Sequence, residues 1–162
     1  MAGHKLTQLG HPAGKKIQTY LTSNQNLFNN ESQRRLAYAD GVIAISGATG
    51  LQLARDLYGI DVAAPELLDR FNAMLHTFGY AQALGRTADL CAEGRLWITL
   101  TGLHSRSARE GLPPRHQHGH PRHPHVWVYE IDRKNRPKED SPCENCRQWV
   151  RGEFLTLNGT SG

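Results

Sequence analysis

Apolar residues recur at helical spacing in three parts of the chain. The clearest part begins at Pro65 and ends at Gly79, and it carries one continuous apolar stripe: Leu67, Leu68, Phe71, Met74, Leu75 and Phe78. Proline suits the first turn of a helix and glycine suits its end. Leu51–Tyr58 has the same spacing and stops before Gly59, and Cys91–Leu103 begins polar and becomes apolar. The pattern predicts three helices, and the helix that begins at Pro65 is expected to pack its apolar stripe into the core.

Shorter apolar runs are typical of strands. Val42–Ile45 is a β-branched run between two glycines, and Val126–Ile131 alternates between its two faces. Phe154–Leu157 has the length of a last short strand. This mixed order of helices and strands predicts a single α/β domain, with a small mixed sheet and helices on both faces.

The remaining segments are polar. Residues 1–35 are rich in Asn, Gln, Ser and Lys, and we expect a loose lead-in, partly ordered, before a domain that spans 36–158 and a tail at 159–162. Residues 104–125 are poor in apolar side chains and contain four prolines, which predicts an exposed loop. After a charged turn over 132–141, Pro142 lies where another helix would start.

Length and composition restrict the class of protein. With 162 residues, 38% of them hydrophobic and 21% charged, the chain suits one compact domain, and its glycine and proline content excludes collagen and coiled coil. No apolar run approaches the roughly 18 residues of a membrane helix. The first residues, MAGHKLTQLGHPAGKK, show no secretory signal. These features predict a soluble domain.

All three cysteines lie in two short motifs, Cys91-Ala92-Glu93 and Pro142-Cys143-Glu144-Asn145-Cys146. A Cys-x-x-Cys pair at a helix start turns both sulfurs toward one point, and a third cysteine at another helix start completes a set of three thiolates. Zinc with three protein ligands keeps its fourth position open for water, and Glu93 is placed to move that water's protons. The motifs predict one catalytic zinc ion per chain. A structural zinc site with a histidine as fourth ligand, or three unrelated buried thiols, are the alternatives.

At these residues the sequence resembles the zinc-dependent cytidine deaminase superfamily, whose signature is H/C-x-E followed by P-C-x-x-C. The resemblance implies that Cys91, Cys143 and Cys146 bind zinc at two helix N-termini, and that Glu93 carries protons between water, the base and the leaving ammonia. It covers about the C-terminal half of the chain, where the order helix–strand–helix matches the central unit of that fold.

Compact, divergent chains with these motifs look most like the bacterial toxin-type deaminases, which are usually C-terminal domains of larger secreted proteins. That resemblance implies delivery as part of a larger toxin, activity in the cytoplasm of a target cell, and an immunity protein as partner. The long basic loop between the two motifs departs from the family pattern.

The charge distribution favours a nucleic-acid substrate. The formal net charge is +4, and residues 104–125 hold Arg106, Arg109, Arg115 and Arg122 against the single Glu110. A cationic loop beside the predicted pocket suits a phosphate backbone. The same segment contains six of the nine histidines, His104 and His125 among them, and a His-rich metal-binding tract is the competing interpretation.

We therefore expect zinc-dependent deamination of cytosine to uracil in single- or double-stranded nucleic acid, with DNA favoured over RNA. Ala92, His125, Trp127, Arg115 and Arg122 are the predicted substrate contacts. Trp97 is expected in the core, whereas Trp149 suits either the core or base stacking. A deaminase of free cytidine or a related nucleoside antibiotic is the alternative enzyme. A non-catalytic zinc module that binds nucleic acid is the alternative of another class.

Overall fold

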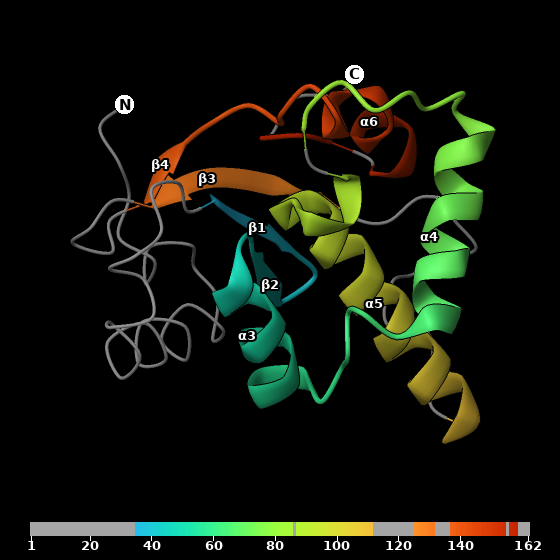
Figure 1. Ribbon diagram of the computed structural model, residues 1–162. Coiled ribbons are helices and arrows are strands. Elements are labelled where there is room, and N and C mark those ends of the chain that lie inside the picture. The colour runs from blue at the N-terminus through green and yellow to red at the C-terminus, as the bar shows by residue number, and fades with distance from the viewer. Residues whose placement is uncertain (1–34, 86, 112–124, 132–136, 155, 159–162) are drawn as a thin grey trace.

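A four-stranded antiparallel sheet organises the domain. The computed structural model describes residues 35–85, 87–111, 125–131, 137–154 and 156–158. The strands are β1 (Arg35–Ala39), β2 (Val42–Ile45), β3 (Trp127–Ile131) and β4 (Pro137–Glu139), in the order β2-β1-β3-β4 (Figure 1). Every pair of neighbouring strands is antiparallel, so the expected mixed sheet is wrong. The α/β class is confirmed, and so are the strands predicted over 42–45 and 126–131.

The hairpin of β1 and β2 was only half predicted, because the sequence pattern indicated no strand over residues 35–39. Asp40 and Gly41 connect the strands, and both have positive φ angles, 49° and 75°. Two such residues form the tight turn whose twist matches a β-hairpin, and Asp-Gly is a preferred pair for it. This turn pairs Ala39 with Val42 and places the alternating residues of β1 on two faces.

Helices cover both faces of the sheet, as expected. On one face, small residues of β1 and β2 such as Ala37 and Ala44 allow close packing of α5 (Ala92–Arg109). On the other face, Leu36 and Ile43 pack against Leu53 of α3 (Ala48–Tyr58). Each helix therefore buries its apolar side against a different layer of the hydrophobic core.

Helix α4 (Pro65–Thr77) forms a further layer and lies along the outer side of α5 (Figure 1). Its predicted stripe is confirmed at Leu67, Phe71, Met74 and Leu75, all of which are buried, whereas Phe78 follows the helix and is 38% exposed. The predicted end of α3 is confirmed as well, because Gly59 caps it in the left-handed conformation with a φ of 66°.

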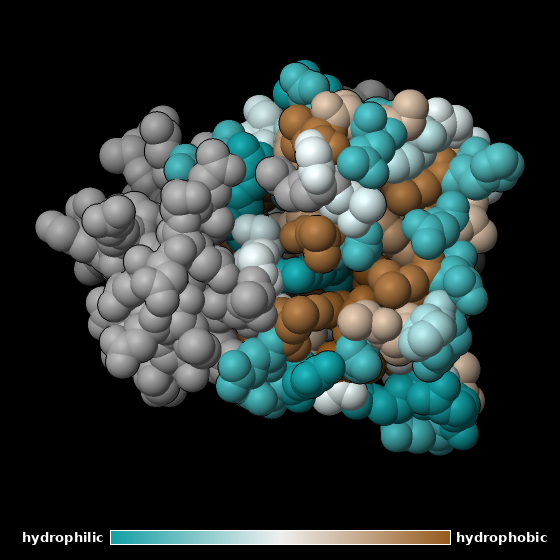
Figure 2. Space-filling view, viewed as in Figure 1, coloured by the Kyte–Doolittle hydropathy of each residue, from teal (hydrophilic) through white to brown (hydrophobic). Residues whose placement is uncertain are grey.

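Helix α5 is longer than the sequence pattern indicates. Residues 104–109 were assigned to the exposed loop, but they form the last turns of α5. The far end of this helix carries hydrophilic residues on the surface (lower right in Figure 2). Arg106 there donates a hydrogen bond of 2.8 Å to the carbonyl of Tyr58, at the end of α3. Residues 104–109 contain few apolar side chains because they are on the surface, and not because they form a loop. They contain no proline or glycine, so the helix can continue through them. Residues 112–124 of the predicted loop lie outside the described residues.

The C-terminal part also departs from expectation. The helix predicted from Pro142 is instead a turn at 144–145, a 3₁₀-helix over Cys146–Gln148 and the short α6 (Val150–Glu153). In place of the strand predicted over 154–157, Leu157 forms an isolated parallel bridge with Val126. None of the helices in the described ranges is both long and apolar enough to cross a membrane.

Gly50 provides a test of the packing between α3 and β2. A Cβ atom at Gly50 would overlap the carbonyl oxygen of Ile45, whereas a Cβ at Gly85 would meet nothing within 4 Å. The carbonyl oxygen belongs to the backbone and cannot move aside as a flexible side chain could. We therefore expect Gly50→Ala to lower the free energy of unfolding by about 2–3 kcal/mol. Gly85→Ala is the matched control and should change it by less than about 0.5 kcal/mol. Urea denaturation of both variants measures the difference, and equal stabilities would contradict the close packing.

Candidate metal centre

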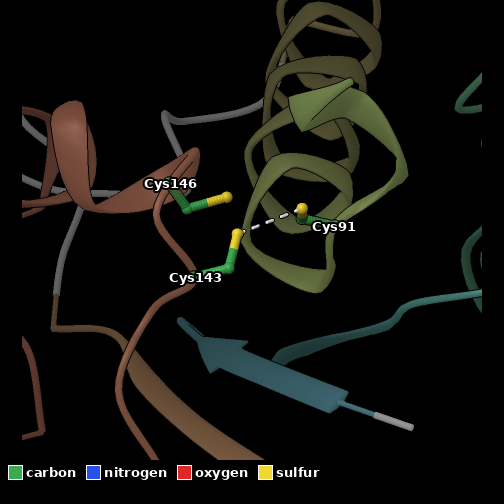
Figure 3. Close-up of side chains that lie close together, drawn as sticks. All are labelled: Cys91, Cys143 and Cys146. Atoms are coloured by element: carbon green, nitrogen blue, oxygen red, sulfur yellow. Dashed lines mark hydrogen bonds between the residues drawn. The ribbon is translucent and has the colours of Figure 1, made fainter. Parts of the chain in front are cut away.

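The three cysteines come together from segments far apart in the sequence. Cys91 is the N-cap of α5, Cys143 follows β4, and Cys146 begins the 3₁₀-helix. Their sulfur atoms lie within 4.8 Å of one another and point toward a common centre (Figure 3). Cys91 Sγ and Cys143 Sγ are 3.3 Å apart, and all three cysteines are buried and free of disulfides. Only Cys91 stands at the N-terminus of an α-helix, so the expected placement at two such termini is half correct.

The sulfur positions suit a tetrahedral metal ion. Four thiolates around an ion at a metal–sulfur distance of about 2.3 Å lie roughly 3.8 Å apart. Cys91 Sγ and Cys143 Sγ are slightly closer than that value, at 3.3 Å, and no two of the three sulfurs are more than 4.8 Å apart. Contacts with the Cys146 and Cys91 thiols lower the pKa of Cys143 far below its usual range, while the pKa of Cys146 is raised. The cluster therefore holds one thiolate readily, and these three cysteines can hold a metal ion.

Glu93 is buried beside this cluster, in the first turn of α5. Its side chain begins in the first turn of α5 and is 1% exposed, and neither carboxylate oxygen is paired among the described residues. Burial raises the pKa of Glu93 to about 7, and the Cys146 thiol lowers it only in part. An ionisable group with a pKa near neutrality, held beside a candidate metal site, is suited to accept and donate protons.

A cavity of about 430 Å³ opens at the cysteine cluster. Its volume is typical of a small-molecule site. Two of the three cysteines and Glu93 reach it together with residues from β1, the β2–α3 turn and α3. The lining residues are Arg35, Ser46, Gly47, Leu51, Leu90, Cys91, Ala92, Glu93, Arg95 and Cys143. The cysteine cluster and the buried carboxylate thus border one cavity that is large enough for a small molecule.

Two arginines of this cavity were missed in the sequence. Arg35 forms an ion pair with Asp140 at 3.2 Å and donates a hydrogen bond of 2.8 Å to the carbonyl of Ser141. Arg95 is buried, and its guanidinium donates to the carbonyls of Ile45, at 3.0 Å, and Gly47. These contacts fix the segment before Cys143 and the β2–α3 turn at the cavity. Because the partners of Arg95 are about 50 residues away in the sequence, no local pattern marks it.

Asn145, between the two cysteines of the second motif, was missed as well. Asn145 is fully buried, and its Oδ1 accepts hydrogen bonds from the backbone N–H groups of Ala83 (2.7 Å) and Leu84 (3.2 Å). Gln148 adds two hydrogen bonds to the backbone of Ala81, at 2.9 and 2.8 Å. These bonds attach the Cys-x-x-Cys turn to the segment that leads to Cys91. They hold the three sulfurs in register independently of a metal ion.

Of the three predicted substrate contacts that the structure describes, Ala92 lines the cavity. Trp127 is half-buried and packs on the face of the sheet that α3 covers, and the exposed His125 pairs with Thr156 Oγ1 at 2.6 Å. Neither of them lines the cavity. Arg115 and Arg122 lie outside the described residues.

Trp97 and Trp149 pack in the hydrophobic core. Each ring lies 5.5 Å from Phe71, measured between ring centroids. Trp97 is 7% exposed and Trp149 is fully buried. The core interpretation is therefore confirmed for Trp97, and base stacking by Trp149 has no exposed ring face to use.

Comparisons with known proteins found no relative of this chain. No protein-family model matches the chain, and searches of curated proteins and of solved structures found no significant match.

The Asn145 contacts predict a measurable effect on metal affinity. We expect the protein to bind one zinc ion, and Asn145→Ala to weaken its zinc affinity about 10- to 100-fold, because the Cys-x-x-Cys turn loses its anchor. Glu144→Ala is the matched control, since Glu144 lies between the same cysteines but is exposed. Competition with a fluorescent chelator measures the affinity. Equal affinities of the two variants would show that the anchor does not position the ligands.

The buried Glu93 carboxyl predicts a pH-dependent stability of the metal-free, reduced protein. The folded state binds the Glu93 proton more tightly than the unfolded chain, so the free energy of unfolding falls as pH rises from about 4.5 to 7. Glu93→Gln has no such proton, and we expect it to stabilise the protein by about 3 kcal/mol more at pH 8 than at pH 4.5. Urea denaturation with a chelator tests this, with the exposed Glu110→Gln as control. A gain that is equal at both pH values would contradict the burial of an ionisable carboxyl here.

Proposed function

We propose that this protein is a zinc-dependent hydrolase that deaminates cytosine to uracil in nucleic acid. The observation that carries the proposal is the opening of the cysteine cluster and the unpaired Glu93 carboxylate on one cavity. A structural metal site is closed by four protein ligands. Among the described residues only three sulfurs converge here. A position for a water molecule next to a buried carboxylate is what hydrolysis requires.

Zinc is the metal that this donor set favours. Thiolate ligands select soft or borderline ions, and zinc combines tetrahedral geometry with no redox chemistry of its own. When bound, zinc would lower the pKa of a coordinated water toward about 7. Cys91, Cys143 and Cys146 would be its ligands, as the resemblance to cytidine deaminases also implies.

Glu93 would manage the protons of the reaction. Its carboxylate would accept a proton from the attacking water and donate it to the ring nitrogen next to the reacting carbon. It would then take the second proton from the hydroxyl group added to that carbon and deliver it to the departing amine. The carbon–oxygen bond forms, the carbon–nitrogen bond breaks, and the products are uracil and ammonia. A pKa near neutrality lets one carboxyl act both as base and as acid. The apolar side chains of Leu51 and Leu90 in the lining offer walls for a planar ring.

The polymeric substrate and the biological setting rest on the sequence. The net charge of +4 and the basic stretch between the motifs favour nucleic acid, and DNA is preferred over RNA in this proposal. The resemblance to toxin-type deaminases further suggests a role as a delivered toxin domain that acts in a target cell and is countered by an immunity protein.

One experiment tests the reaction and its substrate together. The zinc-loaded protein is incubated with single-stranded DNA, duplex DNA, RNA and free cytidine, and uracil or uridine is measured. We expect conversion in DNA, and a loss of at least about 100-fold in Glu93→Gln, because general acid–base catalysis is removed while the zinc ligands stay. Glu144→Gln, which removes an exposed carboxylate of the second motif, is the matched control.

The other outcomes separate the alternatives. Conversion of free cytidine alone would make the protein a nucleoside deaminase. Zinc and DNA binding without any conversion would leave a non-catalytic zinc module. Full activity in Glu93→Gln would refute the proton transfers assigned to this residue.

A further inference from the structure

Tyr80 lies in the short segment that is hydrogen-bonded to the Cys-x-x-Cys turn. It follows α4, and the next residue, Ala81, is bonded through both of its backbone groups to the side chain of Gln148. Gln148 belongs to the 3₁₀-helix that begins at Cys146. The side chain of Tyr80 packs against the core cluster that contains all three cysteines. Its position in the chain therefore brings Tyr80 to the turn that carries two of the candidate metal ligands.

The hydroxyl group of Tyr80 is buried, and its hydrogen bond is missing. The side chain as a whole is half-buried, but its oxygen is shielded from solvent, and no partner for it is found among the residues that the structure describes. Buried tyrosine hydroxyls usually have a partner. Tyr80 does not line the cavity at the cysteine cluster, so a substrate in that cavity would not supply the partner.

The electrostatic surroundings of this hydroxyl identify its neighbours. Burial raises the pKa of Tyr80 above its usual value, and the thiols of Cys146, Cys91 and Cys143 raise it further, with Cys146 having the largest effect of the three. The hydroxyl is thus within electrostatic range of the whole cysteine cluster. The backbone of Ala88 lowers the pKa in part, although its contact with the hydroxyl is not a full hydrogen bond.

Metal binding would give the hydroxyl the acceptor that it lacks. Cysteine thiols lose their protons when they bind a metal ion, and a charged acceptor forms a stronger hydrogen bond than a neutral one. Three thiolates carry more negative charge than a divalent ion neutralises, and excess charge in a buried site requires a hydrogen-bond donor. The usual zinc ligands are cysteine, histidine and carboxylates, so a donor role suits a tyrosine here better than a ligand role.

We propose that the Tyr80 hydroxyl donates a hydrogen bond to the sulfur of Cys146 when the cysteine cluster holds zinc. Tyr80 is then a positioning residue, which acts through a metal ligand and does not touch the substrate. The hydrogen bond withdraws negative charge from the sulfur and fixes its orientation. This inference rests on the zinc site of the proposed function, but it does not depend on deamination.

Cobalt(II) in place of zinc reports such a hydrogen bond. The sulfur-to-cobalt charge-transfer band depends on the electron density of the thiolates, which hydrogen bonds to sulfur reduce. Tyr80→Phe keeps the ring and removes only the hydroxyl. We expect its charge-transfer band to move to longer wavelength, because a thiolate without a donor gives up an electron more easily. We also expect its zinc affinity, measured by chelator competition, to fall about tenfold.

The matched control is Tyr58→Phe, which removes a hydroxyl that has a structural partner. Tyr58 accepts a 2.9 Å hydrogen bond from the backbone N–H of Ile43 on β2. We expect this variant to unfold at lower urea concentration, with an unchanged charge-transfer band and an unchanged zinc affinity.

The stability of Tyr80→Phe separates the proposed role from simple packing. In the reduced, metal-free protein its urea midpoint should stay the same or rise, because a buried hydroxyl without a partner is removed. In the zinc-bound protein the midpoint should fall, because the hydrogen bond to sulfur is lost. A fall of equal size in both forms would indicate a packing defect and would overturn the proposal.

Other results would overturn it as well. These are an unchanged band and affinity in Tyr80→Phe, an equal band shift in Tyr58→Phe, or tyrosinate absorbance on zinc binding, which would make Tyr80 a ligand. A wild-type protein that binds neither zinc nor cobalt would overturn both this inference and the proposed function. If Tyr80→Phe behaves as expected but no substrate is deaminated, the positioning role stands and the enzyme assignment fails. If deamination occurs and Tyr80→Phe has no effect, the reverse holds.

Discussion

Helix α5 is buried over its first twelve residues, Ala92–Leu103, between the sheet and α4, so every polar group that it carries into the interior needs a partner there. Arg95 finds the carbonyls of Ile45 and Gly47, and Thr99 returns its hydroxyl to the carbonyl of Arg95 at 2.7 Å. These bonds tie the helix to the β2–α3 turn and thereby shape one wall of the cavity at the cysteine cluster. For the Glu93 carboxylate, in contrast, no hydrogen bond is found among the residues that the structure describes.

An unpaired carboxyl in a protein interior is costly, and its raised pKa is the direct expression of that cost. A core that served stability alone would carry an apolar side chain at this position. Under the proposed function, a water molecule and a substrate would occupy the adjoining cavity. Glu93 would then have hydrogen-bond partners, and the free-energy cost of burying it would be offset when the substrate is bound. The same helix start supplies Cys91, so one buried turn carries both a candidate sulfur ligand and the carboxylate to which we assign the proton transfers.

The cysteine cluster depends on contacts between segments that are distant in the sequence. Cys91 and Cys143 are separated by 52 positions, yet their sulfurs lie 3.3 Å apart. The fully buried Asn145 makes this approach specific, because its two hydrogen bonds place the Cys-x-x-Cys turn against the chain that leads to α5. Arg35 does the same from the side of the sheet through Asp140 and Ser141. Polar contacts, and not only apolar packing, position the candidate metal ligands.

The sequence by itself determined those features that neighbouring residues control. The apolar stripe of α4, the β-branched run of β2 and the pairing of a Cys-x-Glu with a Cys-x-x-Cys motif are all local, because periodicity and motif spacing act within a few residues. The strand β1 carries the sequence RLAYA, with no β-branched residue, and its best signal was the Asp40-Gly41 turn that follows it. The last turns of α5 could not be predicted from their polar composition, because exposed helices and exposed loops are both rich in polar residues.

Only the tertiary structure decided the antiparallel order of the sheet, the partners of Arg35, Arg95 and Asn145, and the cavity at the cysteine cluster. Each of these features joins residues that are far apart along the chain, and the energies that select them come from burial and from hydrogen bonds that form only when the domain has folded.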